Sequence, residues 1–386
     1  MSRLFFHVQY LKGLGHLRRI GLIAAAARDK GAEVHVASGG LPVEGLIPEG
    51  VALHQLPALQ AGPGGFGDLR DATGAPVDAA WKRRRREALL ALYGDISPDV
   101  LVIETFPFGR RALAFELLAL LEAARAGRPC AAIVCSIRDI LQEPRKPERA
   151  QESLQRLNGN FDAVMVHGDP AFMRLESSFP LAGRIAPPLF YSGIVAPDAA
   201  LYEPGEESAS GTVVVSAGAG SIGVGLLDTA LAARNETPLQ GCRWRLIAGP
   251  HLPQSDFERL AARAGGEVSV ERFVEDFPRV LAGARLSISY AGYNTVADVL
   301  RAHVPAVLVA YGGSDGRETE QGMRARRMAE LGLAAALPDA DLTPSALAGA
   351  IAQALRPAAG SGISPALDGA ERSAEFLIAQ TQRKRR

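Results

Sequence analysis

The sequence is poor in cysteine, carries no net charge and lacks long apolar runs. Its three cysteines, Cys130, Cys135 and Cys242, stand in no zinc-binding spacing, and their odd number argues against a disulfide framework. We therefore expect small, reduced core residues. The 42 basic side chains equal the 42 acidic ones, so the overall charge gives no reason to expect a nucleic-acid partner.

Nowhere does the chain reach the roughly 18 consecutive apolar residues of a membrane-spanning helix. It opens with Met1-Ser2-Arg3-Leu4 and runs at once into strand-like sequence, which argues against a cleaved signal peptide. These absences predict a cytoplasmic protein, with any membrane contact peripheral and at the inner face.

Short apolar or β-branched runs alternate with longer segments rich in Ala, Leu and Arg. This alternation is typical of α/β architecture with parallel strands, and at roughly 100–200 residues per domain the chain allows two domains. In the first half the predicted strands are 4–9, 33–38, 52–56, 99–103, 131–135 and 163–166, and the predicted helices are 16–29, 79–93, 111–126 and 147–158. The Gly- and Pro-rich stretch 59–76 has no periodicity, which predicts a long functional or mobile loop.

Around 191–211 the pattern gives way to Pro, Gly, Ser and acidic residues, which predicts a linker. A second alternating series starts at Thr212, with later strands predicted at 243–248, 268–270, 286–289, 306–309 and 333–336. Ser255 and Glu258 have the spacing of a capping box, which predicts a helix after the second of these strands. Two similar α/β domains in tandem account for the pattern.

A glycine turn, "KGLGHLRR", follows the first predicted strand. A dinucleotide fingerprint would need a third glycine where Arg18 stands, and an acidic residue where the second strand ends in Ser38-Gly39-Gly40. Both are missing, so the NAD interpretation fails. What remains is a turn at Gly13 and Gly15 that lets backbone N–H groups approach an anion.

The same turn presents His16 at a helix N-terminus. The positive end of the helix dipole keeps a histidine neutral, and a neutral imidazole can accept a proton, which favours a general base. The alternative is a histidine that only caps or packs at the turn.

A second glycine turn, "VSAGAGSIG", directly follows the strand at 213–215 and carries Gly218, Gly220 and Gly223. Backbone amides and the N-terminus of the next helix could bind a diphosphate here, whereas a purely structural turn would need glycine for geometry alone. The motif G-x-x-x-x-G-K-[ST] is absent, which argues against a P-loop NTPase.

The segment "SISYAGYNTVADVLRAHVPAVLVAYGGSDGRETEQGMRARRMAELG", residues 287–332, parses as strand, glycine turn, helix 294–302, strand 306–309, polar loop and helix. Here the sequence resembles the C-terminal domain of the MurG-type family 28 glycosyltransferases. The resemblance extends from about Thr212 to Leu355, and its motifs follow one another in the family's order. It implies the GT-B fold, α/β with two Rossmann-like domains facing a central cleft.

The resemblance assigns donor-binding roles motif by motif. The turn at Gly218, Ala219 and Gly220 matches the family's diphosphate loop. The family usually has a serine where Gly218 stands, so one hydrogen bond to the phosphate is either missing or supplied by Ser216 or Ser221. The segment "ERFVEDF" matches the part of the family whose backbone contacts the uracil edge, and its centre is Phe273 and Val274.

In the run Gly292-x-x-Thr295-x-x-Asp298, Asp298 takes the place of the family's glutamate that binds the ribose hydroxyls, and is one methylene shorter. Glu320 and Gln321 lie where the family has the loop that contacts the donor sugar, with Glu320 replacing a glutamine. Taken alone, these side chains also suit a solvated helix surface. Their order along the chain favours the functional interpretation.

The first half resembles a bacterial group of predicted glycosyltransferases through "GLGHLRR", "ETFPFGRR" and "SIRDIL". The implied domains are an acceptor-side domain at 1–195, a linker at 196–211, a nucleotide-sugar-binding domain at 212–366 and a C-terminal helix at 367–386 that packs back on the first domain. The implied reaction is an inverting transfer of a hexose or N-acetylhexosamine from a UDP-sugar to an acceptor hydroxyl. No D-x-D pair stands where it would hold a metal-bound diphosphate, so neither metal nor cofactor is expected beyond the UDP-sugar co-substrate.

Such a transfer needs a base for the acceptor hydroxyl. His16 is the first choice, and Glu104 and Asp139, both near the carboxyl ends of predicted strands, are the alternatives. Two other functions fit the same fold: a sugar-nucleotide epimerase or hydrolase, and a non-catalytic nucleotide-sugar-binding protein.

A run of basic residues on a predicted helix has two interpretations. Arg83, Arg84, Arg85 and Arg86 could dock anionic lipid headgroups or a phosphorylated or lipid-linked acceptor. They could also form an ordinary solvated helix face.

Overall fold

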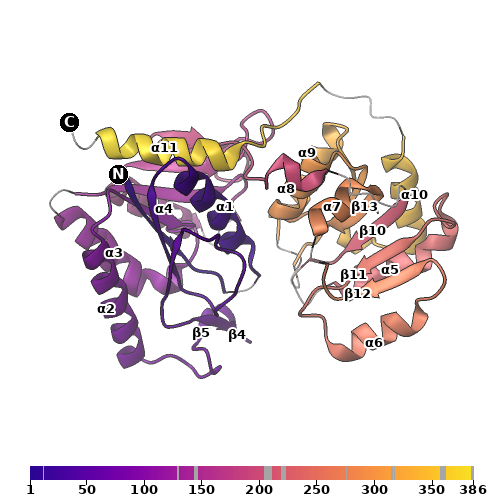
Figure 1. Cartoon of the computed structure of the whole chain (residues 1–386), viewed down its shortest axis with the longest axis horizontal. Coiled ribbons are helices and arrows are strands. Elements are labelled where there is room, and N and C mark those ends of the chain that lie inside the picture. The colour runs from indigo at the N-terminus through magenta and orange to yellow at the C-terminus, as the bar shows by residue number, and fades with distance from the viewer. Residues whose placement is uncertain are drawn as a thin grey trace. The chain divides into compact units, whose positions relative to one another are not determined.

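The computed structural model describes residues 1–11, 13–127, 130–142, 147–203, 211–218, 223–274, 276–313, 316, 318–356 and 362–383. The chain divides into two compact units (Figure 1). The first unit is Met1–Val195 together with Pro365–Arg386, and the second is Ala196–Ser364. Within the described residues, no helix is long and apolar enough to cross a membrane.

The first unit is built on a parallel sheet in the order β3-β2-β1-β6-β7-β8-β9. Its strands are β1 (Arg3–Val8), β2 (Glu33–Ser38), β3 (Ala52–Gln55), β6 (Val100–Glu104), β7 (Ala132–Arg138), β8 (Ala163–His167) and β9 (Leu189–Tyr191). Its α-helices are α1 (Gly15–Asp29), α2 (Ala79–Ile96), α3 (Ala114–Ala126), α4 (Pro147–Asn160) and α11 (Gly369–Arg383). Short 3-10 helices are Arg111–Leu113, Leu175–Ser177 and Ala182–Arg184.

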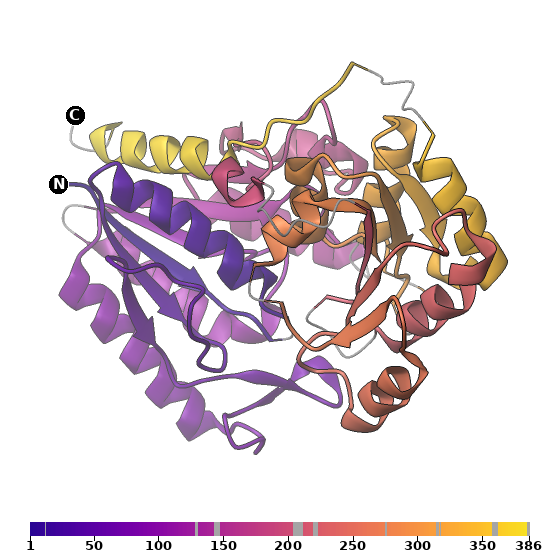
Figure 2. The same cartoon turned by 45° about the vertical axis from the view of Figure 1, so that its right-hand side comes forward.

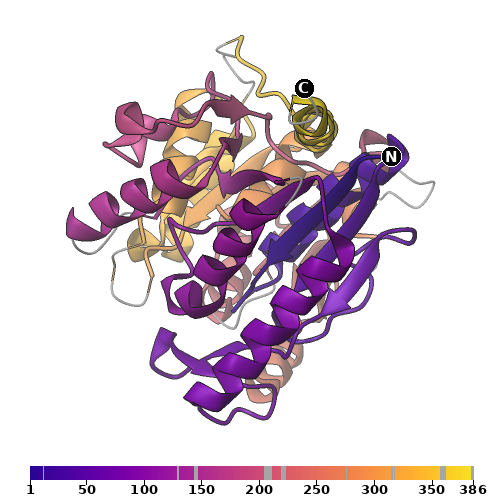
Figure 3. The same cartoon turned by 90° about the vertical axis from the view of Figure 1, so that its left-hand side faces the viewer.

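This sheet buries a separate apolar core on each face, because successive side chains of a strand point to opposite sides. In β1, Phe5 belongs to the core under α2, α3 and α4, and Phe6 to the core under α1 and α11. Figures 2 and 3 show α11, in yellow, across the strands of this unit from α2. Burial on both faces explains why β6 is apolar almost throughout.

Helix α11 folds onto the first unit although the second unit precedes it in the sequence. The ring of Phe376 stacks on Phe190 with centroids 4.2 Å apart, and Lys30 pairs with Glu375 at 2.7 Å. Where the two chain segments meet, the Ile194 N–H donates to the carbonyl of Ala366 at 2.8 Å and the Gly369 N–H to that of Ile194 at 3.1 Å. A Cβ on Gly369 would lie 2.5 Å from the carbonyl oxygen of Gly193, so this approach requires glycine.

The second unit has a parallel sheet in the order β12-β11-β10-β13-β14-β15. Its strands are β10 (Thr212–Ser216), β11 (Trp244–Ile247), β12 (Val268–Glu271), β13 (Ala284–Tyr290), β14 (Ala306–Ala310) and β15 (Ala335–Pro338). Its α-helices are α5 (Val224–Ala233), α6 (Gln254–Arg263), α7 (Phe277–Ala282), α8 (Tyr293–Ala302), α9 (Glu320–Glu330) and α10 (Pro344–Ala354), with 3-10 helices at Ala199–Tyr202, Arg234–Glu236 and Asp339–Asp341. Its core packs the strands against residues of α5, α6 and α10.

In each sheet the strand order reverses at one place. In the first unit this place lies between β1 and β6, and in the second between β10 and β13. Ligands of parallel α/β sheets bind outside the carboxyl ends of the strands at such a reversal. The topology therefore points to one candidate site in each unit.

Three sequence expectations need correction. The stretch 59–76 is not an irregular loop, because β4 (Gln60–Gly62) and β5 (Gly65–Arg70) pair as an antiparallel hairpin around a left-handed Gly65. Strand β9 was not expected at all. Helix α6 exists, but it begins at Gln254 and no side chain among the described residues caps it, so the capping box at Ser255 was wrong.

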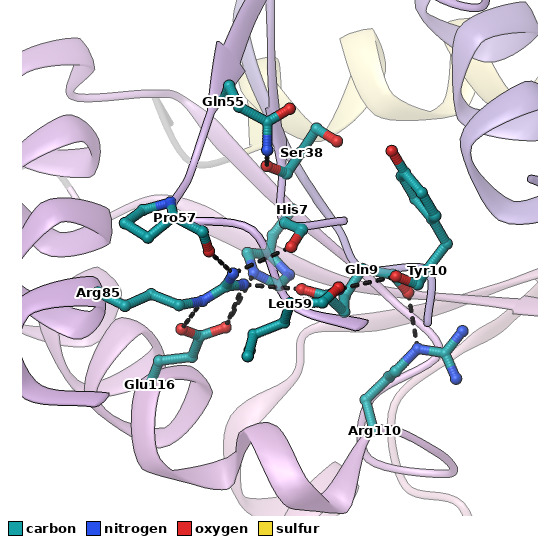
Figure 4. A network of polar contacts seen from close by, with 11 residues as sticks. His7, Gln9, Tyr10, Ser38, Gln55, Pro57, Leu59, Arg85, Arg110 and Glu116 are labelled. Atoms are coloured by element: carbon teal, nitrogen blue, oxygen red, sulfur yellow. Dashed lines mark hydrogen bonds and ion pairs between the residues drawn. The ribbon is translucent and has the colours of Figure 1, made fainter. Parts of the chain in front are cut away.

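Arg85 of α2 is fully buried, with 0% of it exposed. Its guanidinium pairs with Glu116 of α3, Nε to Oε2 at 2.7 Å and Nη2 to Oε1 at 2.9 Å. It also donates to the carbonyl oxygen of Gly39 at 3.0 Å. Figure 4 shows its hydrogen bond to the side-chain oxygen of Gln9, which is 2.8 Å long. Arg85 thereby ties the segments that follow β1 and β2 to α2 and α3.

The expectation that Arg83 to Arg86 act together as a docking surface is therefore wrong at Arg85. An α-helix completes one turn every 3.6 residues, so the side chains of four consecutive residues point in all directions around it. On a helix that packs against the core, one of the four therefore faces inward. Arg83 and Arg84 are exposed and Arg86 is half-buried. Membrane contact through these three stays a prediction.

Replacing Arg85 by methionine would leave Glu116 buried without its partner, so we expect Arg85→Met to lose about 3–5 kcal/mol of unfolding free energy. The double variant Arg85→Met/Glu116→Leu removes both charges and should lose less than Arg85→Met alone. Arg84→Met, at an exposed position of the same helix, should change stability by less than about 0.5 kcal/mol. Urea unfolding followed by circular dichroism measures all three, and equal losses for Arg84→Met and Arg85→Met would contradict the assignment.

Candidate active site

His16 lies in the first turn of α1, directly after the glycine turn that follows β1. Gly13 in that turn has φ +62°, a left-handed conformation that suits glycine. No side chain among the described residues caps α1. The His16 side chain is 14% exposed, which leaves part of the ring open to solvent.

Glu104, the last residue of β6, holds His16 in one orientation. Its Oε1 lies 2.9 Å from Nδ1 of His16, and the same oxygen accepts a hydrogen bond from Arg19 of α1. A carboxylate only accepts hydrogen bonds, so a neutral His16 carries its proton on Nδ1 and keeps the lone pair on Nε2. That tautomer can take a proton from a hydroxyl group at Nε2.

The second oxygen of Glu104 starts a chain of hydrogen bonds across the carboxyl ends of neighbouring strands. Ser136 of β7 donates its hydroxyl to Oε2 of Glu104, and its Oγ lies 2.8 Å from Nε2 of His167 of β8. Since the single hydroxyl proton of Ser136 goes to the carboxylate, Nε2 of His167 must be the donor. Nδ1 of His167 then faces Oγ of Ser192, at 3.2 Å, next to the end of β9.

Burial and neighbouring charges set the protonation of this chain. Burial lowers the pKa of His16 to about 3; the hydrogen bond to Glu104 opposes this, and the charges of Arg110 and Arg138 add to it. Burial alone would raise the pKa of Glu104, but Arg19 and His16 outweigh it and hold that pKa below its usual range. Burial likewise lowers the pKa of His167 to about 3. At neutral pH the site therefore contains neutral imidazoles around a charged carboxylate.

Asp139, the third candidate base, follows β7 and is 1% exposed. Its Oδ1 accepts the N–H of Ile140 at 2.9 Å. A Cβ on Gly168 would lie 2.9 Å from the Cβ of Asp139, so the two residues are in close contact. The charge of Asp139 acts on His167. The structure thus brings His16 and Glu104 into contact, and puts Asp139 at the next strand end.

In the second unit the predicted diphosphate turn follows β10, at the reversal of strand order. Gly218 has φ +74°. A Cβ on Gly223 would lie 2.1 Å from Cβ of Ala217, so the close approach of the turn to the start of α5 requires glycine. No described side chain caps α5, which leaves N–H groups of its first turn for an anion. The other predicted members of the turn, Ala219, Gly220 and Ser221, lie outside the described residues.

Asp298 of α8 is buried, with 2% of it exposed. The hydroxyl of Tyr202 donates to its Oδ1 at 2.5 Å. The interpretation as a solvated helix acid is therefore wrong. The carboxylate already has a protein partner, and its role in ribose binding stays a prediction.

Glu320 and Gln321 begin α9, and both side chains contact other residues of the protein. Glu320 is 5% exposed and pairs with the buried Arg324 at 2.8 Å, whose Nη1 donates to the carbonyl oxygen of Ala291 at 2.9 Å. Gln321 accepts the N–H of Tyr311 through Oε1 at 3.4 Å. The interpretation of Glu320 as an exposed first-turn residue is wrong, and contact of either residue with a donor sugar stays a prediction.

The remaining donor-site candidates follow β12 and β13. Phe273 is 69% exposed, and Val274 is half-buried. Gly292 is the N-terminal flanking residue of α8, a helix start that no described side chain caps. Thr295 is half-buried in its first turn, and its Oγ1 would lie 3.7 Å from a Cβ on Gly292.

Sequence reasoning missed the residues that complete the His16 site. Arg19 is one turn of α1 beyond His16, and Ser136 and His167 lie in β7 and at the end of β8. The signal that the sequence offered was the position of these residues near the carboxyl ends of their strands, because all parallel strands of a sheet end at the same edge. Polar residues near the ends of otherwise apolar strands could have been listed together on that ground.

The second unit carries a family signature. Residues 213–361 match the glycosyltransferase family 28 C-terminal domain. Over 150 residues the chain is 35% identical to a curated relative from Azoarcus sp. (strain BH72). That relative is named UDP-N-acetylglucosamine--N-acetylmuramyl-(pentapeptide) pyrophosphoryl-undecaprenol N-acetylglucosamine transferase. That alignment covers 38% of this chain and 41% of the relative, so the chain matches less than half the length of that relative. The resemblance to family 28 is confirmed.

Solved structures extend the likeness to both units. The calicheamicin glycosyltransferase CalG4 superposes with a TM-score of 0.59 at 16% identity, covering 98% of this chain and 95% of that one. MurG from Acinetobacter baumannii gives a TM-score of 0.56 at 15% identity, covering 99% and 100%. At such identities the likeness shows the fold alone. It confirms the expected α/β fold, the GT-B fold with two Rossmann-like domains.

The lowered histidine pKa values predict that the folded state is acid-sensitive. In the unfolded chain His16 and His167 take up protons near their ordinary pKa of 6.5, but in the folded chain they stay neutral down to about pH 3. Between these values the unfolded state binds more protons, so stability must fall as the pH falls. Each histidine contributes a slope of up to about 1.4 kcal/mol per pH unit.

His167→Gln removes one of these titrating groups. We expect its unfolding free energy to change less steeply between about pH 6 and 4, by about 1.4 kcal/mol per pH unit. Urea unfolding at stepped pH measures the slope, with His251→Gln, at an exposed position, as the matched control. A slope in His167→Gln equal to that of the unaltered chain would contradict the prediction.

Proposed function

We propose that this chain is a glycosyltransferase that moves a sugar from a UDP-sugar to an acceptor hydroxyl. The observation that carries the proposal is that candidate residues lie near the reversal of strand order in both units. His16 follows β1, Glu104 ends β6, Gly218 follows β10, and Asp298 lies in α8, the helix after β13. The family 28 match of the second unit and the fold likeness support it.

In this proposal the acceptor hydroxyl gives its proton to Nε2 of His16 as its oxygen attacks the anomeric carbon of the sugar. The bond from that carbon to the diphosphate oxygen breaks, and its electron pair leaves with UDP. Attack opposite the leaving group inverts the anomeric configuration. Glu104 is a positioning residue, because both of its oxygens already accept hydrogen bonds, and it stabilises the imidazolium that forms.

The leaving diphosphate gathers negative charge, which uncapped N–H groups at the start of α5 stabilise without a metal ion. The name of the curated relative specifies UDP-N-acetylglucosamine and a pyrophosphoryl-undecaprenol acceptor. By extension we propose a hexose or N-acetylhexosamine as the sugar and a lipid-linked acceptor, met in the cytoplasm at the inner membrane face.

Donor binding is tested by thermal shift with UDP-, GDP-, ADP- and dTDP-sugars. We expect selective stabilisation by UDP-sugars, of about 2.7 kcal/mol at a hundredfold excess over Kd. Asp298→Ala should abolish it, because the ribose loses its carboxylate. Tyr202→Phe is the matched control: it removes the hydroxyl that bonds Asp298 but spares the carboxylate, so it should keep or strengthen UDP binding. Full stabilisation of Asp298→Ala by UDP-sugars would refute the ribose role.

The base is tested by transfer of a radiolabelled sugar into the lipid and aqueous fractions of a cell extract. We expect His16→Ala to slow transfer by roughly 10²- to 10⁴-fold while UDP-sugar stabilisation is retained. Glu104→Gln should also be slow, because an amide no longer stabilises the imidazolium. His251→Ala serves as the control. Consumption of UDP-sugar at the same rate without any extract would instead favour an epimerase or hydrolase, and binding without turnover a regulatory protein.

A further inference from the structure

Arg110 is half-buried and differs from the two buried arginines of the first unit. Arg19 pairs with Glu104 and Arg85 with Glu116, whereas Arg110 has no carboxylate partner among the residues that the structure describes. Its Nε donates to the carbonyl oxygen of Gln9 at 2.7 Å. In Figure 4 the two terminal nitrogens of its guanidinium point away from the Arg85 network. They make no hydrogen bond within the described ranges.

The backbone holds Arg110 in a conformation that only glycine adopts easily. Its φ is +60°, and Thr105, at the other end of the same loop, has φ +70°. Left-handed residues other than glycine cost of order 1 kcal/mol and gather at binding and catalytic sites. The loop starts at Glu104, so one segment fixes both the partner of His16 and this arginine.

The charge of a second arginine acts at this loop together with that of Arg110. Arg138, the last residue of β7, acts with Arg110 on His16. Burial lowers the pKa of Arg110 to about 10, and the charge of Arg138 adds to this. Among the described residues, the carboxylate that acts on Arg110 is that of Glu104, and Arg19 already engages it. A partly buried cation of this kind is completed by an anion that the protein itself does not supply.

We propose that Arg110, with Arg138 beside it, binds an oxyanion group of the acceptor next to the hydroxyl that His16 deprotonates. The proposal rests on the proposed function, since it names the acceptor class of the same site. A guanidinium offers its terminal N–H groups as a planar fork that matches two oxygens of a phosphate or a carboxylate. Both arginines belong to the first unit, so the group is assigned to the acceptor and not to the nucleotide sugar.

Such an anion would also tune the base. A general base works best when its pKa lies near the working pH. Burial is the main cause of the low pKa of His16, and the charges of the two arginines lower it further. An oxyanion bound between them offsets their charge and raises that pKa. An acceptor that carries the group therefore makes His16 a stronger base than a neutral acceptor does.

Inorganic phosphate and acetate are the probes, titrated into the full chain at neutral pH while the ring signals of His16 are followed by NMR. A saturating concentration of UDP keeps the phosphate out of the donor site. We expect a saturable shift of the His16 signals with at least one probe. The probe that binds more tightly identifies the oxyanion of the acceptor as a phosphate or a carboxylate. Arg110→Gln should weaken this binding at least tenfold, while Arg83→Gln, at an exposed position of α2, should leave it unchanged.

Arg110→Lys keeps the charge but loses the fork, so its affinity should fall between those of Arg110→Gln and the unaltered chain. Arg138→Gln gives a second route should Arg110→Gln unfold, and it too should weaken binding. Absence of any His16 shift, or equal probe affinity in Arg110→Gln and the unaltered chain, would overturn the proposal. Tenfold weaker UDP binding in Arg110→Gln would also overturn the proposal, because it would assign Arg110 to the donor site. A chain that binds no UDP refutes the proposed function instead, and the same titration without UDP still tests Arg110.

Discussion

The negative charge of Glu104 is the constraint on which the first-unit site depends. A carboxylate that is 2% exposed survives burial only if its oxygens are bonded and its charge is matched. Arg19 supplies the charge, and His16 and Ser136 supply further donors. Because the carboxylate cannot donate, it dictates where the proton sits on every group that follows along the chain of hydrogen bonds.

The two units share a topology but use it differently. In the first, the reversal of strand order gathers ionisable groups into one connected chain. In the second, two buried carboxylates have separate partners: Asp298 takes the hydroxyl of Tyr202, and Glu320 takes Arg324. The first arrangement suits proton movement. In the second unit, helix starts that no described side chain caps offer backbone N–H groups to an anion. This difference between the units fits the proposed transfer, in which one substrate gives up a proton and the other carries a diphosphate.

Much of the fold was predictable from sequence, because parallel strands covered on both faces read as short apolar runs, as at 100–104. Residues that pack across the sheet were less visible. Nothing in the run of arginines at 83–86 distinguishes Arg85 from its neighbours. Arg85 is the one that faces inward because its partners, Glu116 and Gln9, lie on that side of the helix. The hairpin at 60–70 has too few apolar residues to show a period of two. His16 and Glu104 were each singled out, but their contact spans 88 residues and follows only from the order of the strands.

Helix α11 has a consequence for how the chain comes to be folded. It covers one face of the first sheet through Phe376 and Leu377, and it joins that unit at the crossing of Ile194 with Ala366 and Gly369. A fragment that stops at residue 195 would leave that apolar surface open to water. During synthesis from the N-terminus, the unit that is begun first is therefore the one completed last, once the final helix has left the ribosome.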